Sequence, residues 1–126
     1  MDEVFEATND NGNTIKVDMR KREDKTHLSP TELVLSALAS CAGVDIAVML
    51  KKRKKSVHAF VIETDGTRRE DAPKYFTKIH CKFIITSPDV TEDEVQKSAA
   101  LTFEKYCSVA SSLKADITFS VQVIRA

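Results

Sequence analysis

The sequence predicts an α+β fold in which a long apolar helix is combined with antiparallel pairs of strands. Three observations predict it. Segments that alternate polar and apolar residues lie at both ends and in the middle of the chain, two capping motifs open helical stretches between them, and one helical stretch is apolar on every face. At 126 residues the chain is long enough to bury one hydrophobic core, so a single domain over residues 1–126 is expected.

The N-terminal segment is expected to form a β-hairpin over Glu3–Met19. The stretches "EVFEAT" and "NTIKVDM" alternate polar and apolar residues, and "NDNGN" between them is rich in turn-forming residues. The charged run "RKREDK" at 20–25 is expected to be a loop or a fraying strand end.

The strongest helix start in the chain follows this run. Ser29 is suited to cap the helix, Pro30 suits the first helical position, and Glu32 completes a capping box. The basic run "KKRKK" at 51–55 would end the helix, where the macrodipole favours positive charge. We interpret the run as a solvated cap, with a nucleic-acid patch as the less favoured alternative.

Apolar residues cover all faces of this helix from Leu33 to Leu50, so the helix is expected to be buried all round. A membrane span is disfavoured, because 18 residues is the short limit for a span and the run carries Ser36, Ser40 and Asp45. One small sheet does not cover such a helix. A second copy of the chain is therefore the expected source of cover, with the long helices packed at a dimer interface.

The second half of the chain predicts two strands, a helix and a final strand. The strand-like segments are "VHAFVIETDGTRRE" and "YFTKIHCKFIIT", with "EDAP" as the turn between them. Thr91 and Glu94 form a second capping box that opens a helix to about Tyr106. Its apolar stripe recurs every four residues, at Val95, Ala99, Phe103 and Cys107. The segment "ADITFSVQVI" alternates and predicts the last strand.

The charge balance, the N-terminal residues and the number of cysteines limit the classes of function that the sequence allows. Lys plus Arg and Asp plus Glu number 19 each, so the net charge offers no global attraction for nucleic acid or an anionic membrane. The acidic start "MDEVFEATND" lacks the features of a secretory signal, so a thiol-reducing, cytoplasmic location is expected. In such a location three cysteines are filler, metal ligands or reactive groups rather than a disulfide framework.

Cys81 is predicted to be core filler, because it lies on an apolar strand stripe. The stripe consists of Ile79, Cys81, Phe83 and Ile85. The neighbouring His80 suggests a metal site with His27 and His58, yet the chain has no paired ligand spacing of the CxxC or HxxxH kind. A metal site is therefore disfavoured.

Cys41 and Cys107 are the candidate reactive thiols. Each is expected on a helix beside small residues, "SCAG" and "CSVASS", which leave room for a substrate or a sulfur neighbour. Buried filler is an equally good interpretation from residue type alone. Apolar burial opposes formation of a thiolate, so a catalytic Cys41 requires a nearby cation.

Helix geometry limits which charged groups can help Cys41. Glu32 is nine residues earlier, which places it on the opposite side of the helix and about 13 Å away along the axis. It would act from a partner chain or by orienting an arginine. Asp45, one turn after Cys41, shares its face and as an unpaired anion would oppose a thiolate there. The alternative interpretation is that Asp45 is a charged residue held at the dimer interface.

Two motifs carry a family resemblance. "SPTELVLSALASC", followed about 65 residues later by "KYCSVASSLKADI", resembles the OsmC/Ohr family of thiol-dependent organic hydroperoxide reductases. "RREDAPKYFTKIH" and "EKYCSV" are closest to the YhfA-like branch. The resemblance implies an intertwined homodimer in which six-stranded sheets wrap two long central helices, with two active sites at the subunit interface.

The resemblance also implies the chemistry. Cys41 would be the peroxidatic cysteine, oxidised by an organic hydroperoxide to a sulfenic acid, and Cys107 the resolving cysteine that forms a disulfide with it. A small dithiol or a lipoyl-type protein would reduce the disulfide, with no metal, haem or flavin. The alternative is a non-enzymatic, dimeric redox-sensing or binding module of the same fold.

In the peroxidases of the family a glutamate ten residues before the peroxidatic cysteine binds an arginine that activates the thiol. Here that position holds Thr31, and Glu32 stands one place later. Arg20 is the candidate activating arginine, with Arg22 and Arg69 as alternatives. We therefore name Cys41, Cys107, Glu32 and Arg20 as the candidate catalytic residues.

Overall fold

The computed structural model describes residues 3–126, and the chain forms two compact units, Met1–Val34 and Leu35–Ala126. In the first unit, β1 (Val4–Thr8) pairs with β2 (Thr14–Asp18) in antiparallel register, which confirms the expected hairpin. The charged run after it contains a short 3₁₀ helix, η1 (Arg22–Asp24), where a loop or a fraying strand end was expected.

Helix α1 (Pro30–Lys52) begins with the predicted capping box. The backbone N–H of Ser29 donates to Glu32 Oε1 at 3.0 Å, and the N–H of Glu32 donates to Ser29 Oγ at 3.4 Å. Two donors that the first helical turn would leave unpaired are thereby satisfied. The helix ends in the basic run, also as predicted.

The second unit contains a three-stranded sheet in the order β3–β4–β5. Strands β3 (Ala59–Arg68) and β4 (Phe76–Ser87) are antiparallel, whereas β4 and β5 (Asp116–Arg125) are parallel. The expectation of antiparallel pairs throughout is therefore wrong for β5. The described residues form five strands, in one two-stranded and one three-stranded sheet.

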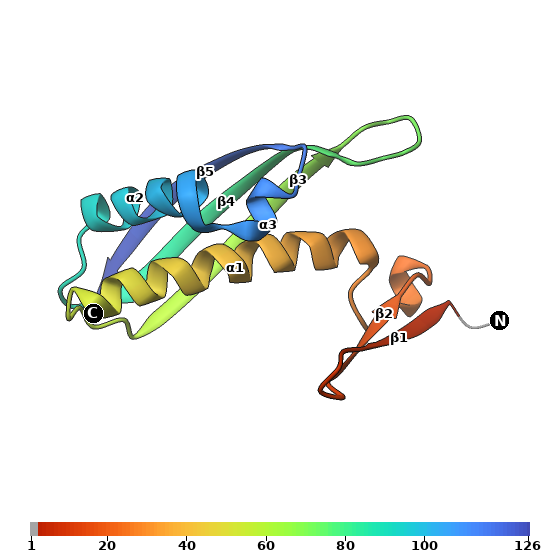
Figure 1. The fold of residues 1–126 in the computed structure, drawn as a ribbon, viewed down its shortest axis with the longest axis horizontal. Helices are drawn as coiled ribbons and strands as arrows, with labels where there is room; N and C mark the ends of the chain where they lie inside the picture. The colour runs from red at the N-terminus through yellow and green to blue at the C-terminus, as the bar shows by residue number, and fades with distance from the viewer. Residues whose placement is uncertain (1–2) are drawn as a thin grey trace. The chain divides into compact units, whose positions relative to one another are not determined.

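The parallel pairing follows from the connection between β4 and β5. It contains α2 (Glu92–Leu101), η2 (Thr102–Tyr106) and α3 (Ser108–Ser111), so the chain crosses over the sheet before entering β5. A helical crossover returns the chain to the end of the sheet where the previous strand began, and the next strand then runs parallel to it. Figure 1 shows α1 and α2 lying along the same face of this sheet.

One face of the sheet and the two helices form the core. Alternate residues of β4 are buried on this face, including Cys81 and Phe83, as the sequence predicted. The helical residues buried in the same cluster are Leu38, Ala42, Ile46 and Leu50 from α1 and Val95 and Ala99 from α2. These residues place both predicted helix stripes against the sheet.

Helix α1 is not buried all round in the single chain, and the expectation that a second copy completes its cover stays a prediction. Its buried stripe recurs every four residues, but Val44 and Val48 are 62% and 45% exposed. The physical reason is that one three-stranded sheet and α2 cover only one side of the helix. By length and composition alone α1 is also apolar enough to cross a membrane, a test that core helices pass as well.

Candidate thiol site

Cys41 lies in the middle of α1, partly exposed, with its side chain against the core cluster. The helix passes close to β3 here: a Cβ added to Gly43 would stand 2.7 Å from Ile62 Cδ1. The small residues after Cys41 therefore serve close packing of helix on sheet. This packing fixes the position of Cys41 relative to the sheet.

Cys107 stands at the junction of η2 and α3 and is 4% exposed. Its N–H donates to the carbonyl of Thr102 at 2.8 Å, which closes a π-helical turn rather than the α-helical end that the sequence predicted. The N–H of Ala110 donates to Cys107 Sγ at 3.4 Å. Backbone hydrogen bonds on both sides thus hold this cysteine in place.

The thiols of Cys41 and Cys107 are neighbours. Burial raises the pKa of Cys107 above its ordinary value, and the nearby Cys41 thiol raises it further. The N–H of Ala110 acts in the opposite direction, because it stabilises the thiolate. All three cysteines of the chain are free thiols in this structure.

Cys81 is the third thiol of the cluster. It is fully buried on β4, and burial, followed by the charge of Cys107, raises its pKa to about 11. A thiol with so high a pKa is protonated at neutral pH and a poor nucleophile. Its predicted place on the core stripe is confirmed.

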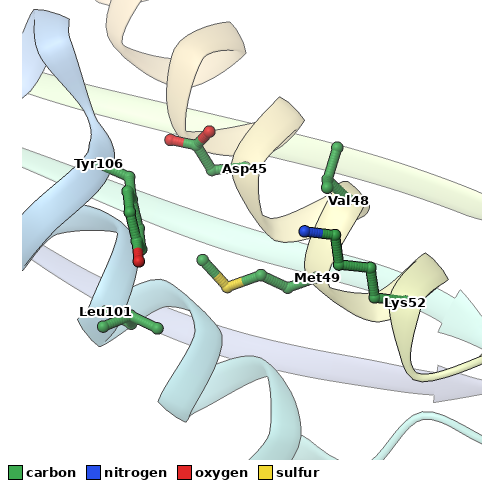
Figure 2. Close-up of a pocket in the computed structure, with 6 residues that line it drawn as sticks. All are labelled: Asp45, Val48, Met49, Lys52, Leu101 and Tyr106. Carbon is green, nitrogen blue, oxygen red and sulfur yellow. The ribbon is translucent and has the colours of Figure 1, made fainter.

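A groove lies next to the two neighbouring thiols. It has a volume of about 290 Å³ and runs between α1 and the α2–η2 segment. Figure 2 shows Asp45 and Met49 of α1 facing Leu101 and Tyr106 across it. The buried oxygen Oδ2 of Asp45 has no hydrogen-bond partner among residues 3–126. The groove therefore has a mainly apolar lining and contains the unpaired hydrogen-bond acceptor Asp45 Oδ2. Asp45 is one helical turn from Cys41.

The candidate Arg20 belongs to the first unit, where Asp18 binds it. Arg20 Nε and Nη2 donate to the two carboxylate oxygens of Asp18 at 3.0 and 2.8 Å. The backbone N–H of Thr26 donates to the same carboxylate at 2.9 Å. Asp18 is fully buried, and its hydrogen bond to Arg20 holds the pKa of the carboxyl well below its usual range.

Asp18 was missed by sequence reasoning. The sequence feature that could have indicated this ion pair is that Asp18 ends a strand and lies two residues before Arg20. Glu32 has a different local role: its carboxylate accepts from Ser29, and this hydrogen bond lowers the pKa of Glu32. The assignment of Arg20 and Glu32 to thiol activation stays a prediction.

The alternative arginine, Arg69, stacks on the ring of Tyr75, with its guanidinium carbon 5.1 Å from the ring centroid. His80, considered above as a metal ligand, contacts the hydroxyl oxygens of Thr118 and Ser120 at 2.7 and 2.9 Å. In the part of the chain that the structure describes, no three His, Cys, Asp or Glu side chains gather as a metal site would require.

Comparisons with known proteins identify the family. The model of the family described as OsmC-like protein matches residues 22–122. The chain is also 38% identical to Protein YhfA of Escherichia coli K12 over 100 aligned residues. The aligned residues make up 78% of this chain and 75% of YhfA. The chain belongs to the OsmC-like family. The likeness to YhfA agrees with the branch that the motifs indicated.

Solved structures extend the OsmC-like assignment to the fold. A hypothetical protein from Aquifex aeolicus VF5 superposes with a TM-score of 0.73 at 29% identity, over 98% of this chain and 97% of that chain. The organic hydroperoxide resistance protein OhrB of Bacillus subtilis superposes with a TM-score of 0.63 at 16% identity, over 97% and 98%. The α+β fold of the OsmC-like family is thus confirmed for this chain.

Proposed function

We propose that this OsmC-like protein is a thiol-dependent peroxidase that reduces organic hydroperoxides through Cys41 and Cys107. The proximity of the two thiols carries the proposal, because a sulfenic acid formed on Cys41 lies near the sulfur that can attack it. Membership of the family supports it, since one solved relative of this fold is an organic hydroperoxide resistance protein.

The reaction runs in two steps. The thiolate of Cys41 attacks the distal oxygen of the hydroperoxide, the O–O bond breaks, and the alkoxide leaves as an alcohol after taking up a proton. Cys107 sulfur then attacks the sulfenic acid of Cys41, and the hydroxyl leaves as water with the proton of the Cys107 thiol. The raised pKa of Cys107 keeps that proton on the thiol until this step.

A reductant and a cation complete the cycle. A small dithiol or a lipoyl-type protein supplies the two electrons that reopen the disulfide, which suits a thiol-reducing cytoplasm. Arg20 is the proposed activating cation and Glu32 its proposed orienting partner. Neither a metal nor a redox cofactor takes part in this scheme.

The proposed active form is a homodimer. Val44 and Val48 present an exposed apolar strip on α1 that the described residues of the single chain leave uncovered. Covering such a strip with the same helix of a second copy removes apolar surface from water. The interface between the two copies would then lie on α1, the helix that carries Cys41.

The test is hydroperoxide consumption in the presence of dithiothreitol. Wild type, Cys41→Ser and Cys107→Ser are compared with cumene hydroperoxide, tert-butyl hydroperoxide and hydrogen peroxide. We expect turnover that prefers the organic peroxides, loss of turnover in Cys41→Ser, and in Cys107→Ser a sulfenic acid that reacts with dimedone.

Two other outcomes would contradict the proposal. Turnover in wild type no greater than in Cys41→Ser would exclude the peroxidase. One stoichiometric round of disulfide formation without turnover would favour the alternative interpretation, a redox-sensing or binding module of the same fold.

A further inference from the structure

A small hollow leads from the surface of the η2–α3 segment to Cys107. It has a volume of about 110 Å³, and all of its lining residues lie within 103–111. Cys107 is buried and Phe103 half-buried, whereas the other lining residues are exposed: Glu104, Lys105, Tyr106, Ser108 and Ser111. We call it the α3 hollow. It shares Tyr106 with the groove at Asp45 but has no lining residue from α1.

The sulfur of Cys107 is held at the start of α3, where the hollow also lies. The N–H of Ala110 donates to Cys107 Sγ at 3.4 Å, so the sulfur lies at the first turn of α3. Ser108 and Ser111 belong to the same short helix and line the hollow. A reagent in the α3 hollow is therefore nearer to the Cys107 end of a Cys41–Cys107 disulfide than a reagent that approaches along α1.

The direction of attack decides which sulfur of a disulfide is released. In thiol–disulfide exchange the incoming, attacked and leaving sulfurs lie nearly in line, so attack on Cys107 expels Cys41, and attack on Cys41 expels Cys107. Burial raises the pKa of Cys107, which makes it a poorer leaving group than an ordinary thiol. Attack on Cys107 avoids this cost in the step that opens the disulfide.

Charge favours the same direction of attack. The groove near Cys41 carries Asp45, whose buried oxygen Oδ2 has no hydrogen-bond partner among residues 3–126. A carboxylate at this position repels an incoming thiolate. The α3 hollow carries Glu104 and Lys105, whose opposite charges balance. A thiolate therefore meets less repulsion in the α3 hollow than in the groove.

We propose that the α3 hollow is the entrance for the reductant, whose thiolate attacks Cys107 and expels Cys41. The inference rests on the proposed function, because it requires the Cys41–Cys107 disulfide. A volume of about 110 Å³ holds roughly three or four water-sized groups of about 30 Å³ each. The hollow therefore admits the thiol end of an unbranched dithiol chain and not the surface of a folded protein.

The reduction runs in two exchange steps. The thiolate of the dithiol forms a bond to Cys107 Sγ, the bond between Cys107 and Cys41 breaks, and Cys41 leaves as a thiolate that takes up a proton. The second thiol of the dithiol loses its proton and attacks the first sulfur of the same molecule. This releases Cys107, which takes up a proton. The dithiol is thereby oxidised to a cyclic disulfide, and the two cysteines gain two electrons.

Reduction is tested apart from peroxidase chemistry, with a disulfide formed by diamide instead of a peroxide. The variant is Ser111→Leu, which places a larger side chain in the α3 hollow, and the matched control is Ser112→Leu, at an exposed neighbour outside it. Both serine hydroxyls donate to the carbonyl of Ser108, at 2.9 and 2.8 Å, so the two variants lose equivalent hydrogen bonds. The reopening of the disulfide by dihydrolipoamide is followed by quenching with maleimide and gel shift.

We expect reduction to be at least about tenfold slower in Ser111→Leu, because access limits the exchange rate, and unchanged in Ser112→Leu. The disulfide yield with diamide should be the same in both variants and wild type, which shows that the variants fold. Equal reduction rates in Ser111→Leu and Ser112→Leu would overturn the inference.

A second measurement identifies the attacked sulfur. Diamide-oxidised wild type is mixed with 2-mercaptoethanol, quenched early with acid, which protonates thiolates and stops further exchange, and mapped by peptide mass spectrometry. We expect the adduct on Cys107, and an adduct mainly on Cys41 would overturn the inference. Failure to form the disulfide with diamide would overturn the inference and the proposed function together. A disulfide that reopens as expected in a protein without peroxide turnover would exclude only the peroxidase.

Discussion

Cys41 and Cys81 have different environments although both contact the same apolar core. Cys41 is partly exposed on α1, beside a groove, whereas Cys81 is fully buried on β4. Burial raises the pKa of Cys81 to about 11, so its thiolate becomes abundant only as pH rises toward that value. The two thiols therefore differ in exposure although both pack against the same core.

Selective alkylation tests this difference. With a pKa of about 11, only about one in a thousand Cys81 thiols is ionised at pH 8. Iodoacetamide at pH 8 should therefore label native Cys41 but not Cys81, and label Cys81 after unfolding in guanidinium, as read by peptide mass spectrometry. Cys81→Ala should keep hydroperoxide turnover. Native labelling of Cys81 as fast as Cys41 would contradict the assignment.

At the scale of elements, the π-helical turn η2 sets the direction of Cys107. A π turn adds one residue to an α-helical turn, and such turns are frequent at functional sites. The N–H of Cys107 donates to Thr102, five residues earlier. Thus the apolar stripe of α2 predicts that Cys107 is buried, and the wider turn determines where its sulfur lies.

Insertion of one residue tests the role of this turn. An alanine inserted after the exposed Glu104 lengthens the segment between Thr102 and Cys107 and should rotate Cys107 by about 100° relative to α2. We expect the insertion variant to lose at least 90% of the Cys41–Cys107 disulfide that wild type forms with one equivalent of cumene hydroperoxide. The yield is measured by maleimide gel shift, with the fold checked by circular dichroism.

Glu104→Ala is the matched control, because it places an alanine in the same turn without changing the length of the turn. It should form the disulfide as wild type does. A folded insertion variant with a wild-type disulfide yield would show that the π turn does not position Cys107.

At the scale of the whole molecule, the apolar composition of α1 and the burial of α1 do not match in one chain. The sheet and α2 bury the stripe that includes Leu38 and Ile46 and leave Val44 and Val48 exposed. The proposed homodimer would explain the mismatch, because a second copy would supply the missing cover. The same arrangement would place an interface beside the thiol site.

Val44→Glu tests the proposed dimer. A carboxylate on the covered strip would have to be buried without a partner, which costs several kcal/mol. We expect a dimeric wild type and a variant whose dimer dissociates at least about a hundredfold more readily, corresponding to about 3 kcal/mol, by light scattering across a dilution series.

The control for this test is Gln96→Glu, which adds the same charge to an exposed position on α2. It should remain dimeric. A monomeric wild type, or a Val44→Glu variant as dimeric as the control, would exclude an interface at this strip.

The sequence by itself determined the features that depend on neighbours a few residues apart. The hairpin of β1 and β2, the capping boxes at Ser29 and Thr91, and the buried stripe containing Cys81 agree with prediction. Each is encoded by local hydrogen bonding or by the period of one element. The two cysteine motifs likewise identified the family before any fold was known.

Only the tertiary structure decided the features that depend on distant segments. It determined that β5 runs parallel to β4 and that α1 is covered on one side. It also brought Cys41 and Cys107 close together although they lie 66 residues apart in the sequence. The physical reason is that such contacts depend on how helices pack on the sheet, and the periodicity of a single element does not contain that information.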